Sequence, residues 1–159
     1  MREDLAPGNR FPELTLPDHT GASLSLDGIA SSQPLVLCFV RGWWCPKEQV
    51  RVRGLVEMQD EIQREYGRIA VVTVDEPYVN GAFRAGLGAA FPFLSDEDRT
   101  VAEELDLLEL TDERHRPYLP FTFVLDSTLR IRRIWCGFLV LEPLERLRVV
   151  EVDDPRASG

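Results

Sequence analysis

Two apolar runs with a helical pattern between them constrain the fold of this chain most strongly. Residues 35–40 and 69–74 are almost wholly apolar runs of strand length, which is typical of strands buried on both faces of a sheet. From Val52 to Tyr66, apolar residues recur at steps of three and four, which indicates an amphipathic helix that Gly67 closes. The order strand, helix, strand predicts a βαβ unit and therefore an α/β fold.

The second half of the chain extends this sheet. Residues 121–126 form a third apolar run, and an alternating segment at 129–138 follows a turn at 127–128, so the two segments predict a β-hairpin. Together these elements predict a mixed sheet with helices on both faces. The weaker elements that we expect are an edge strand or extended arm at 22–26, a short helix at 79–88, an extended piece at 91–94, a helix at 98–107 capped by Asp96 or Asp98, a terminal helix at 142–150 and a frayed tail from Asp153.

Length and charge limit the class of protein. The chain has 159 residues, the size of one domain, and we expect a single domain over 1–159. The net charge of −9, from 18 basic and 27 acidic residues, disfavours binding to nucleic acids or to anionic membranes. No apolar run has the length of a membrane span. The first residues hold no apolar signal core, so we expect a cytoplasmic location.

The chain has three cysteines, at positions 38, 45 and 136. They form no Cys-x-x-Cys pair and do not predict a disulfide framework. The two histidines, His19 and His115, are far apart and lack the spacing of a zinc site, so we expect no metal and no cofactor. The remaining reason to consider a cysteine is its reactivity.

Cys45 has the sequence context of a reactive cysteine. Pro46 follows it directly, and proline is favoured at the first helical position, which places Cys45 at the N-cap. A sulfur atom there faces unpaired backbone N–H groups and the positive end of the helix dipole, and both favour the thiolate. Arg41, on the preceding loop, is a candidate source of further positive charge. The alternative is that Cys45 is a small apolar cap residue.

Other residues near Cys45 also have two interpretations. Glu48 could reach back to the N–H of the cap residue, as in a capping box, or it could orient neighbouring groups and relay a proton. Trp43 and Trp44 could form a wall of the site or pack against the following helix. Cys38 lies in the middle of an apolar strand and Cys136 on an alternating one, so we interpret these two cysteines as structural.

The segment RGWWCPKEQ, between the apolar strand and the amphipathic helix, resembles the active-site segment of the AhpC/TSA (redoxin) branch of peroxiredoxin-like proteins. Three further stretches agree with this resemblance: PGNRFPELTLPDHTG, FPFLSDEDRTVAEELDL and LPFTFVLDSTLRIRRIW. The resemblance covers about residues 6–150 and implies a thioredoxin-like three-layer α/β/α sandwich with a mixed central sheet. It also implies that Cys45 is the peroxidatic cysteine and that Pro120 is a cis-proline beside it.

The sequence departs from the family pattern at several positions. Peroxiredoxins carry a proline and a threonine or serine seven and three residues before the cysteine, where this chain has Cys38 and Gly42. The family's arginine before the late strand is replaced by Pro120, which leaves Arg41 or Arg116 as substitutes. The second cysteine of the thioredoxin motif is replaced by Glu48.

The resemblance implies a peroxiredoxin-like oxidoreductase, a thiol-dependent peroxidase that acts on a peroxide through Cys45. It would be of the one-cysteine type and would be reduced by an external thiol, either a thioredoxin-like protein or a small thiol. Two alternatives remain: a thiol–disulfide oxidoreductase that forms mixed disulfides, and a non-catalytic redoxin-fold binding module. A homodimer is an assembly that this family often forms.

Overall fold

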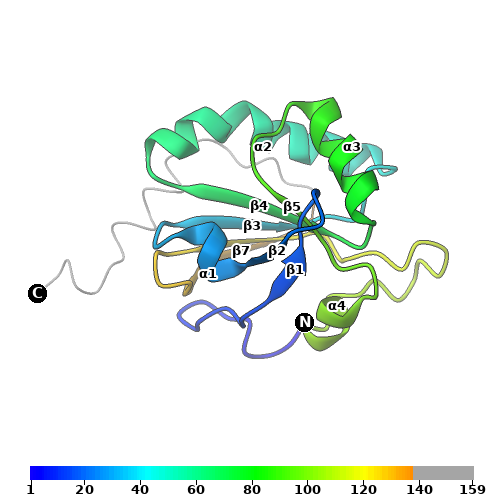
Figure 1. The fold of residues 1–159 in the computed structure, drawn as a ribbon. Helices are drawn as coiled ribbons and strands as arrows, with labels where there is room; N and C mark the ends of the chain where they lie inside the picture. The colour runs from blue at the N-terminus through cyan, green and yellow to red at the C-terminus, as the bar shows by residue number, and fades with distance from the viewer. Residues whose placement is uncertain (138–159) are drawn as a thin grey trace, which may run out of the picture.

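The computed structural model describes residues 1–137 and shows a mixed five-stranded sheet with the strand order β5-β4-β3-β6-β7 (Figure 1). Strand β3 lies at the centre, parallel to β4 and antiparallel to β6. The segments 142–150 and 153–159, expected to be a helix and a tail, lie outside the described residues. The strands of this sheet are β3 (Leu35–Phe39), β4 (Arg68–Thr73), β5 (Phe93–Ser95), β6 (Phe121–Leu125) and β7 (Ile131–Cys136).

Both faces of the sheet are covered, as the sequence predicts. Helices α2 (Pro46–Arg64) and α3 (Pro77–Leu87) lie on one face and bury a cluster that includes Val36 and Val71 (Figure 1). The other face buries a second cluster that includes Leu37 and Phe123. Four short elements and the N-terminal segment lie on that side: β1 (Thr15–Pro17), β2 (Ser23–Ser25), α1 (Leu26–Ala30) and α4 (Thr100–Glu104).

The βαβ unit, the C-terminal hairpin and the thioredoxin-like three-layer arrangement are confirmed. The segment 22–26 differs, because the strand stops at Ser25 and a short helix begins at Leu26. The Oγ atom of Ser25 accepts a hydrogen bond from the Gly28 N–H at 3.0 Å, which caps that helix. Tyr66 also differs, because it lies beyond the end of α2 at φ 63° with 72% of its surface exposed.

The helix expected at 98–107 is shorter in the structure, Thr100–Glu104, and its N-cap is Arg99 rather than Asp96 or Asp98. Both acidic residues nevertheless contribute to its start. The carboxylate of Asp96 accepts hydrogen bonds from the N–H groups of Val101 and Ala102, at 3.2 and 2.8 Å. Asp98 accepts one from the N–H of Thr100 at 3.1 Å. The first turn of the helix is therefore satisfied by two side chains.

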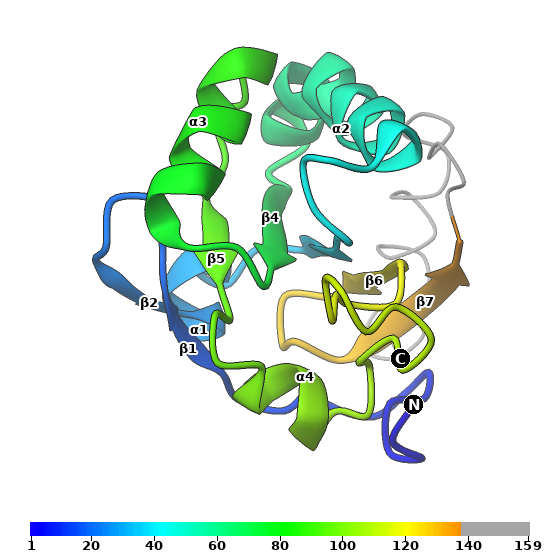
Figure 2. The same ribbon diagram turned by 90° about the vertical axis from the view of Figure 1, so that its right-hand side faces the viewer.

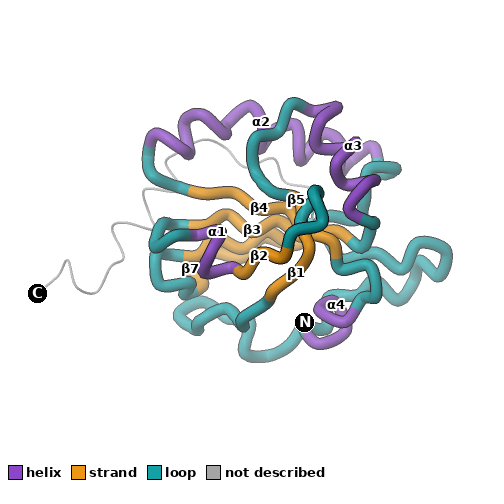
Figure 3. Tube along the Cα trace, in the orientation of Figure 1, coloured by secondary structure: helices purple, strands orange, loops and turns teal. Residues whose placement is uncertain are grey.

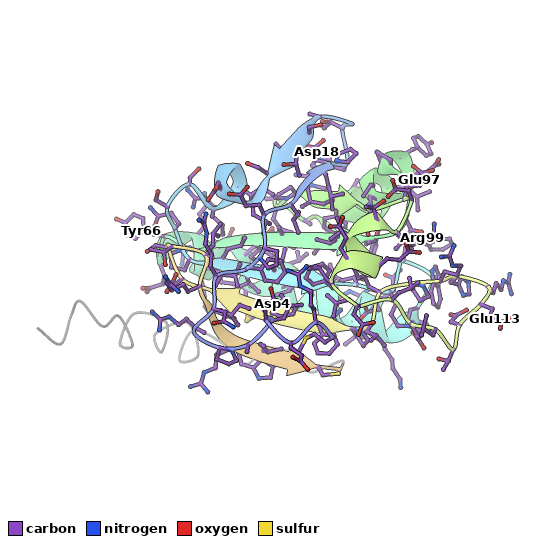
Figure 4. All side chains as sticks on the ribbon, turned by 90° about the horizontal axis from the view of Figure 1, so that it is seen from below. Asp4, Asp18, Tyr66, Glu97, Arg99 and Glu113 are labelled. Carbon is purple, nitrogen blue, oxygen red and sulfur yellow. The ribbon has the colours of Figure 1, made fainter. Side chains whose placement is uncertain are left out.

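The carboxyl end of β3 faces a long loop between α4 and β6 (Figures 2 and 3). This loop, residues 107–119, is closed at its base by a bridge between Leu108 and Tyr118, and Glu113 stands near its outer end (Figure 4). It lies beside the segment that connects β3 to α2, so this edge of the sheet brings together the segment that carries Cys45 and the loop 107–119.

Within the described residues, no helix combines the length and apolar character that crossing a bilayer requires.

Candidate active site

Cys45 occupies the N-cap of α2, as the sequence predicts. Its backbone is extended, with φ −89° and ψ 115°, and Pro46 is the first helical residue. Its side chain forms no capping hydrogen bond, and only 5% of the residue's surface is exposed. The sulfur atom therefore sits at the positive end of a 19-residue helix and is largely shielded from water.

Arg41 brings a cation to this sulfur. Its Nη1 atom lies 3.9 Å from the Sγ atom of Cys45. The same guanidinium forms two ion pairs with the loop 107–119, from Nε to the Glu109 carboxylate at 2.8 Å and from Nη2 to the Asp112 carboxylate at 3.1 Å. The positive charge is thus held in place by two carboxylates while one of its edges faces the sulfur.

Trp44 and His115 complete a closed cluster around Arg41. Their rings are stacked, with centroids 3.7 Å apart and planes 12° apart. The Cζ atom of Arg41 lies 5.0 Å from the Trp44 ring centroid, a cation–π distance. The His115 Nδ1 atom lies 3.0 Å from the Asp112 carboxylate, so Asp112 contacts both Arg41 and His115. We call Arg41, Trp44, Asp112 and His115 the Arg41 cluster.

The pKa of the Asp112 carboxyl is lowered, first by the hydrogen bond from the His115 backbone N–H and then by the His115 ring and the Arg41 charge. The carboxylate therefore stays ionised well into the acidic range.

Gly42 shows why this chain lacks the family's threonine or serine at that position. Its φ of 150° is unfavourable for residues with a side chain. A Cβ atom at residue 42 would collide with the indole ring of Trp44, at Nε1 and Cδ1. The indole N–H of Trp44 thus occupies the space in which a hydroxyl-bearing side chain would begin.

Glu48 and Arg51 form a buried ion pair beneath the cysteine. The Glu48 side chain is 0% exposed and that of Arg51 is 2% exposed. Arg51 donates from Nε and Nη2 to the two carboxylate oxygens at 2.8 and 2.9 Å. Its Nη1 donates to Thr122 Oγ1 at 3.0 Å and its Nη2 donates to the Phe39 carbonyl. The pair therefore joins α2 to strands β3 and β6.

Glu48 does reach back along the chain, but not to the cap residue. Its Oε2 atom accepts a hydrogen bond from the backbone N–H of Arg41 at 2.6 Å, whereas the N–H of Cys45 donates to the Gly42 carbonyl at 3.3 Å. The capping-box interpretation is therefore wrong, because Glu48 accepts a hydrogen bond from the N–H of Arg41 and not from that of the cap residue Cys45. Glu48 instead orients the start of the loop that carries Arg41.

Three other predicted site residues are placed differently from the expectation. The Leu119–Pro120 bond is trans, as are all peptide bonds of the described residues, in keeping with the usual preference of X–Pro bonds. Trp43 is 50% exposed and lines the hollow between α2 and α3 rather than joining the Arg41 cluster. Arg116 pairs with Glu103 at the surface, so Arg41 alone of the two proposed substitutes reaches the cysteine.

The other two cysteines are in environments that differ from that of Cys45. Cys38 is buried in β3, its Sγ lies 3.6 Å from Thr122 Oγ1, and burial raises the pKa of its thiol. Cys136 is exposed at the end of β7, where it pairs with Phe121. Since Phe121 packs on the face opposite α2, the Cys136 side chain points to that face as well.

Asp75 is a further acid near this edge of the sheet, and it is half-buried. It follows β4, its carboxylate accepts a hydrogen bond from the Trp43 backbone N–H, and its Oδ2 atom is buried without a hydrogen-bond partner among the described residues. Burial raises the pKa of this carboxyl, and the charge of Arg99 opposes that shift only in part.

Sequence reasoning missed five of the residues at this site. Their common feature is a charged or titratable side chain that meets the cysteine segment only in the fold. Glu109, Asp112 and His115 carry one available signal, a spacing of three residues just before β6. The missed residues are Arg51, Asp75, Glu109, Asp112 and His115.

The described residues hold no cluster of three or more histidine, cysteine or acidic side chains suited to a metal ion.

A cysteine at the N-cap of the helix that follows the central strand, on a thioredoxin-like sheet, defines a thiol-based redox protein of the thioredoxin fold. The family model "AhpC/TSA family" matches residues 7–134, and the chain belongs to this family. Members of the family are thiol peroxidases, and the chain is accordingly an oxidoreductase of the peroxiredoxin class.

Solved structures agree on the fold. The peroxidoxin BcpB from Mycobacterium tuberculosis is 19% identical, with a TM-score of 0.81, 92% of this chain covered and 97% of that one. A cysteine-to-serine mutant of PrxQ from Xylella fastidiosa is 19% identical, with a TM-score of 0.77 and coverage of 98% and 99%. A yeast mitochondrial 1-Cys peroxiredoxin is 14% identical, with a TM-score of 0.76 and coverage of 97% and 78%. No curated protein sequence matches the chain.

Proposed function

We propose that this protein is a thiol-dependent peroxidase of the one-cysteine type, with Cys45 as the peroxidatic residue. The observation that carries the proposal is the Arg41 Nη1 atom 3.9 Å from the Cys45 Sγ atom, at the start of α2. A guanidinium and a helix N-terminus both favour the thiolate, which is the nucleophile.

The proposed reaction has two stages. The Cys45 thiolate attacks the outer oxygen of a hydroperoxide, so that an S–O bond forms and the O–O bond breaks. The electron pair leaves with the alkoxide, which takes up a proton and departs as an alcohol, or as water from hydrogen peroxide. Cys45 is then a sulfenic acid. An external thiol displaces water from it to form a mixed disulfide, and a second thiol releases Cys45 as the external disulfide forms.

Trp44 supplies the hydrogen-bond donor that the family takes from a hydroxyl. Its indole N–H fills the space beside Gly42, and an indole N–H can only donate. The ring is held by its stack on His115 and by its contact with the Arg41 guanidinium. In the proposed complex Arg41 and Trp44 both donate to the peroxide oxygens, and their donation stabilises the charge that develops on the leaving oxygen.

The one-cysteine assignment rests on the other two thiols. Cys38 is buried and its raised pKa disfavours the thiolate at neutral pH. Cys136 points to the face of the sheet opposite α2. Neither is suited to resolve a sulfenic acid on Cys45 within one chain.

The reductant is proposed to be an external thiol, either a thioredoxin-like protein or a small thiol. The similar yeast 1-Cys peroxiredoxin is described as resolved through glutathione and thioredoxin systems, which supports this choice. We further propose a cytoplasmic location, where such thiols are held reduced, and a homodimeric assembly.

Cysteine variants test the proposal directly. Peroxide consumption in the presence of excess thiol is measured for the full chain and for Cys45→Ser, Cys136→Ser and Cys38→Ala. We expect Cys45→Ser to lose consumption entirely and Cys136→Ser to keep it within about two-fold, since Cys136 faces away from the site. Cys38→Ala is expected to keep turnover with reduced stability, because it leaves a small cavity in the core.

Two results would overturn the proposal. If the wild-type chain reduces model disulfides but leaves peroxide untouched, the protein is a thiol–disulfide oxidoreductase. If neither reaction occurs and Cys45 is alkylated no faster than a free thiol, the protein is a non-catalytic binding module. Loss of turnover in Cys136→Ser would instead reject the one-cysteine assignment alone.

A further inference from the structure

A second hollow lies far from Cys45. It has a volume of about 420 Å³ and is formed by α1, the last turns of α2, the start of β4 and the segment before β5. Gly67 lines this hollow, and the residue before it is Tyr66. Tyr66 lies at the opposite end of the molecule from Glu113 of the loop 107–119 (Figure 4). Because Cys45 caps the other end of α2, the length of this 19-residue helix separates the two places. We call this hollow the α1–α2 cavity.

The walls of the α1–α2 cavity combine apolar and basic side chains. Its polar lining consists of His19, Arg68, Arg84 and two glutamines, and no acidic residue lines it. This distribution is unusual in a chain with a net charge of −9. The apolar part of the lining is provided by residues such as Ile29, Ile62, Ile69 and Phe91. A volume of this size lies in the range of small-molecule sites.

Among residues 1–137, neither of the two arginines of the cavity is paired with a carboxylate. Arg84 donates from Nε to the Phe91 carbonyl at 2.9 Å, and Arg68 donates from Nη1 to the Gly67 carbonyl at 3.4 Å. Each is half-buried and lines the cavity, and each guanidinium has five N–H donors, more than its one carbonyl partner uses.

His19 contributes a third donor. Its Nδ1 atom is buried and has no hydrogen-bond partner among residues 1–137. The adjacent Asp18 attracts His19, but its own Oδ1 atom accepts from Thr20 and Ala22 in the turn of the β1–β2 hairpin. Burial and the Arg84 charge lower the pKa of the His19 imidazole, so at neutral pH it offers one N–H.

We propose that the α1–α2 cavity binds a medium-chain aliphatic monocarboxylate. The carboxylate lies between the guanidinium groups of Arg68 and Arg84, which suit a planar bidentate acceptor. The alkyl chain lies against Ile29, Ile62 and Phe91. This site is independent of the peroxidase chemistry proposed for Cys45, and either proposal can fail without the other.

Calorimetric titration of the full chain with decanoate tests the ligand class. Each buried methylene strengthens binding about four-fold, so decanoate is expected to bind at least about ten-fold more tightly than hexanoate. Decanol and decyltrimethylammonium, which keep the chain but lose or invert the charge, are expected to bind at least about ten-fold more weakly than decanoate. Equal binding of decanol, or no saturable binding of decanoate up to about 1 mM, would overturn the proposal.

Variants locate the site. Arg68→Met with Arg84→Met removes both guanidinium groups and is expected to weaken decanoate binding at least about ten-fold. Ala90→Trp fills the cavity from an exposed position with both arginines retained, and we expect the same loss. The matched control is Arg53→Met, an exposed arginine of the same helix layer outside the cavity, which should leave binding unchanged. Equal weakening by Arg53→Met, or full binding by Ala90→Trp, would reject this location. Near-ultraviolet circular dichroism checks that each variant is folded.

Discussion

At the scale of single residues, the chemistry proposed for Cys45 depends on Arg41 and Trp44. The Arg41 Nη1 atom lies 3.9 Å from the Cys45 Sγ atom, and the Trp44 indole lies where a side chain at residue 42 would begin. Both residues come from the run of four residues before Cys45. A change that removes only the Trp44 indole N–H should therefore affect the peroxide step with little effect on the fold, whereas a change of Arg41 also breaks its ion pairs with Glu109 and Asp112.

Trp44→Phe isolates the indole N–H, because phenylalanine keeps an aromatic ring to stack on His115. We expect the rate of sulfenic acid formation with peroxide to fall at least about ten-fold, because losing one transition-state donor typically costs about 100- to 1,000-fold. Alkylation of Cys45 by iodoacetamide needs no such donor and should stay within about two-fold. Stopped-flow kinetics measures both rates. Equal falls in the two rates would mean that Trp44 acts on the thiolate or on access rather than on the peroxide.

For Asp75, the raised pKa of its carboxyl predicts how the free energy of unfolding changes with pH. Burial raises the pKa of its carboxyl in the folded state, so the native protein binds this proton more tightly than the unfolded chain does. Its contribution to stability is complete below the unfolded-state pKa of about 3.9 and is lost as the pH rises through the folded-state pKa. Asp75→Asn, which cannot ionise, should therefore raise the free energy of unfolding at pH 7 by about 1 kcal/mol.

The difference between Asp75→Asn and the wild type should shrink as the pH approaches 4, which urea unfolding at several pH values can follow. Asp98→Asn is the matched control, because the Thr100 N–H lowers the pKa of Asp98. Stability from that group is present above the unfolded pKa and is lost on acidification. The control should thus be destabilised at pH 7 and approach the wild type in acid. Effects of the same sign in both variants would contradict the assignment.

At the scale of elements, the loop 107–119 is held against the segment that carries the cysteine. Glu109 and Asp112 pair with Arg41, and the stack of His115 on Trp44 adds an apolar contact. Because only 5% of Cys45 is exposed, we expect these contacts to influence which reagents reach its sulfur atom.

Asp112→Asn should loosen this loop, because Asp112 contacts both Arg41 and His115. We expect alkylation of Cys45 by a bulky maleimide to speed up about five-fold relative to alkylation by iodoacetamide, since partly buried charged contacts of this kind contribute about 1 kcal/mol each. The ratio of the two rates is measured by mass spectrometry. Arg116→Gln breaks an exposed ion pair of the same loop with Glu103 and should leave the ratio unchanged. An unchanged ratio in Asp112→Asn would show that the loop does not limit access.

Elements with strong local signals were predictable from the sequence. Strands β3, β4 and β6 are buried on both faces and read as apolar runs, and α2 has a clear helical period. Helix α1 was not predicted, because its five residues are too few to show a period. Pro120 was expected to be cis from the family resemblance alone, and nothing in its local sequence opposed the trans form that is found.

The same distinction applies to the site. Cys45, Arg41 and Glu48 lie within one strand–loop–helix junction, so local geometry placed them near each other. Asp112 is 71 residues from Arg41 in the sequence, and only the crossing of the loop 107–119 over the sheet edge joins them. Arg51 was missed because a buried arginine in a helix is not distinguished by spacing from an exposed one.

At the scale of the whole molecule, the Glu48–Arg51 pair ties the active-site helix to the centre of the sheet. Through Arg51, α2 is bonded to the Phe39 carbonyl of β3 and the Thr122 hydroxyl of β6. Both members are almost fully buried. Removing one member leaves an uncompensated buried charge, which typically costs about 3–5 kcal/mol, whereas replacing both with apolar residues can be nearly neutral.

We therefore expect Glu48→Met and Arg51→Met each to lower the free energy of unfolding by about 3 kcal/mol or more, and the double variant to be more stable than either single one. Urea unfolding gives the three values, and an unchanged slope shows that the denatured state is the same. The double variant should stay folded because it leaves no uncompensated buried charge. It also removes the Glu48 carboxylate that accepts from the Arg41 N–H, so we expect its peroxide turnover to fall. If the loss of unfolding free energy in the double variant equals the sum of the two single losses, the two side chains stabilise the fold separately and do not act as a pair. In that case Arg51 is not needed to orient Glu48 toward the Arg41 N–H, and Arg51→Met should keep full turnover.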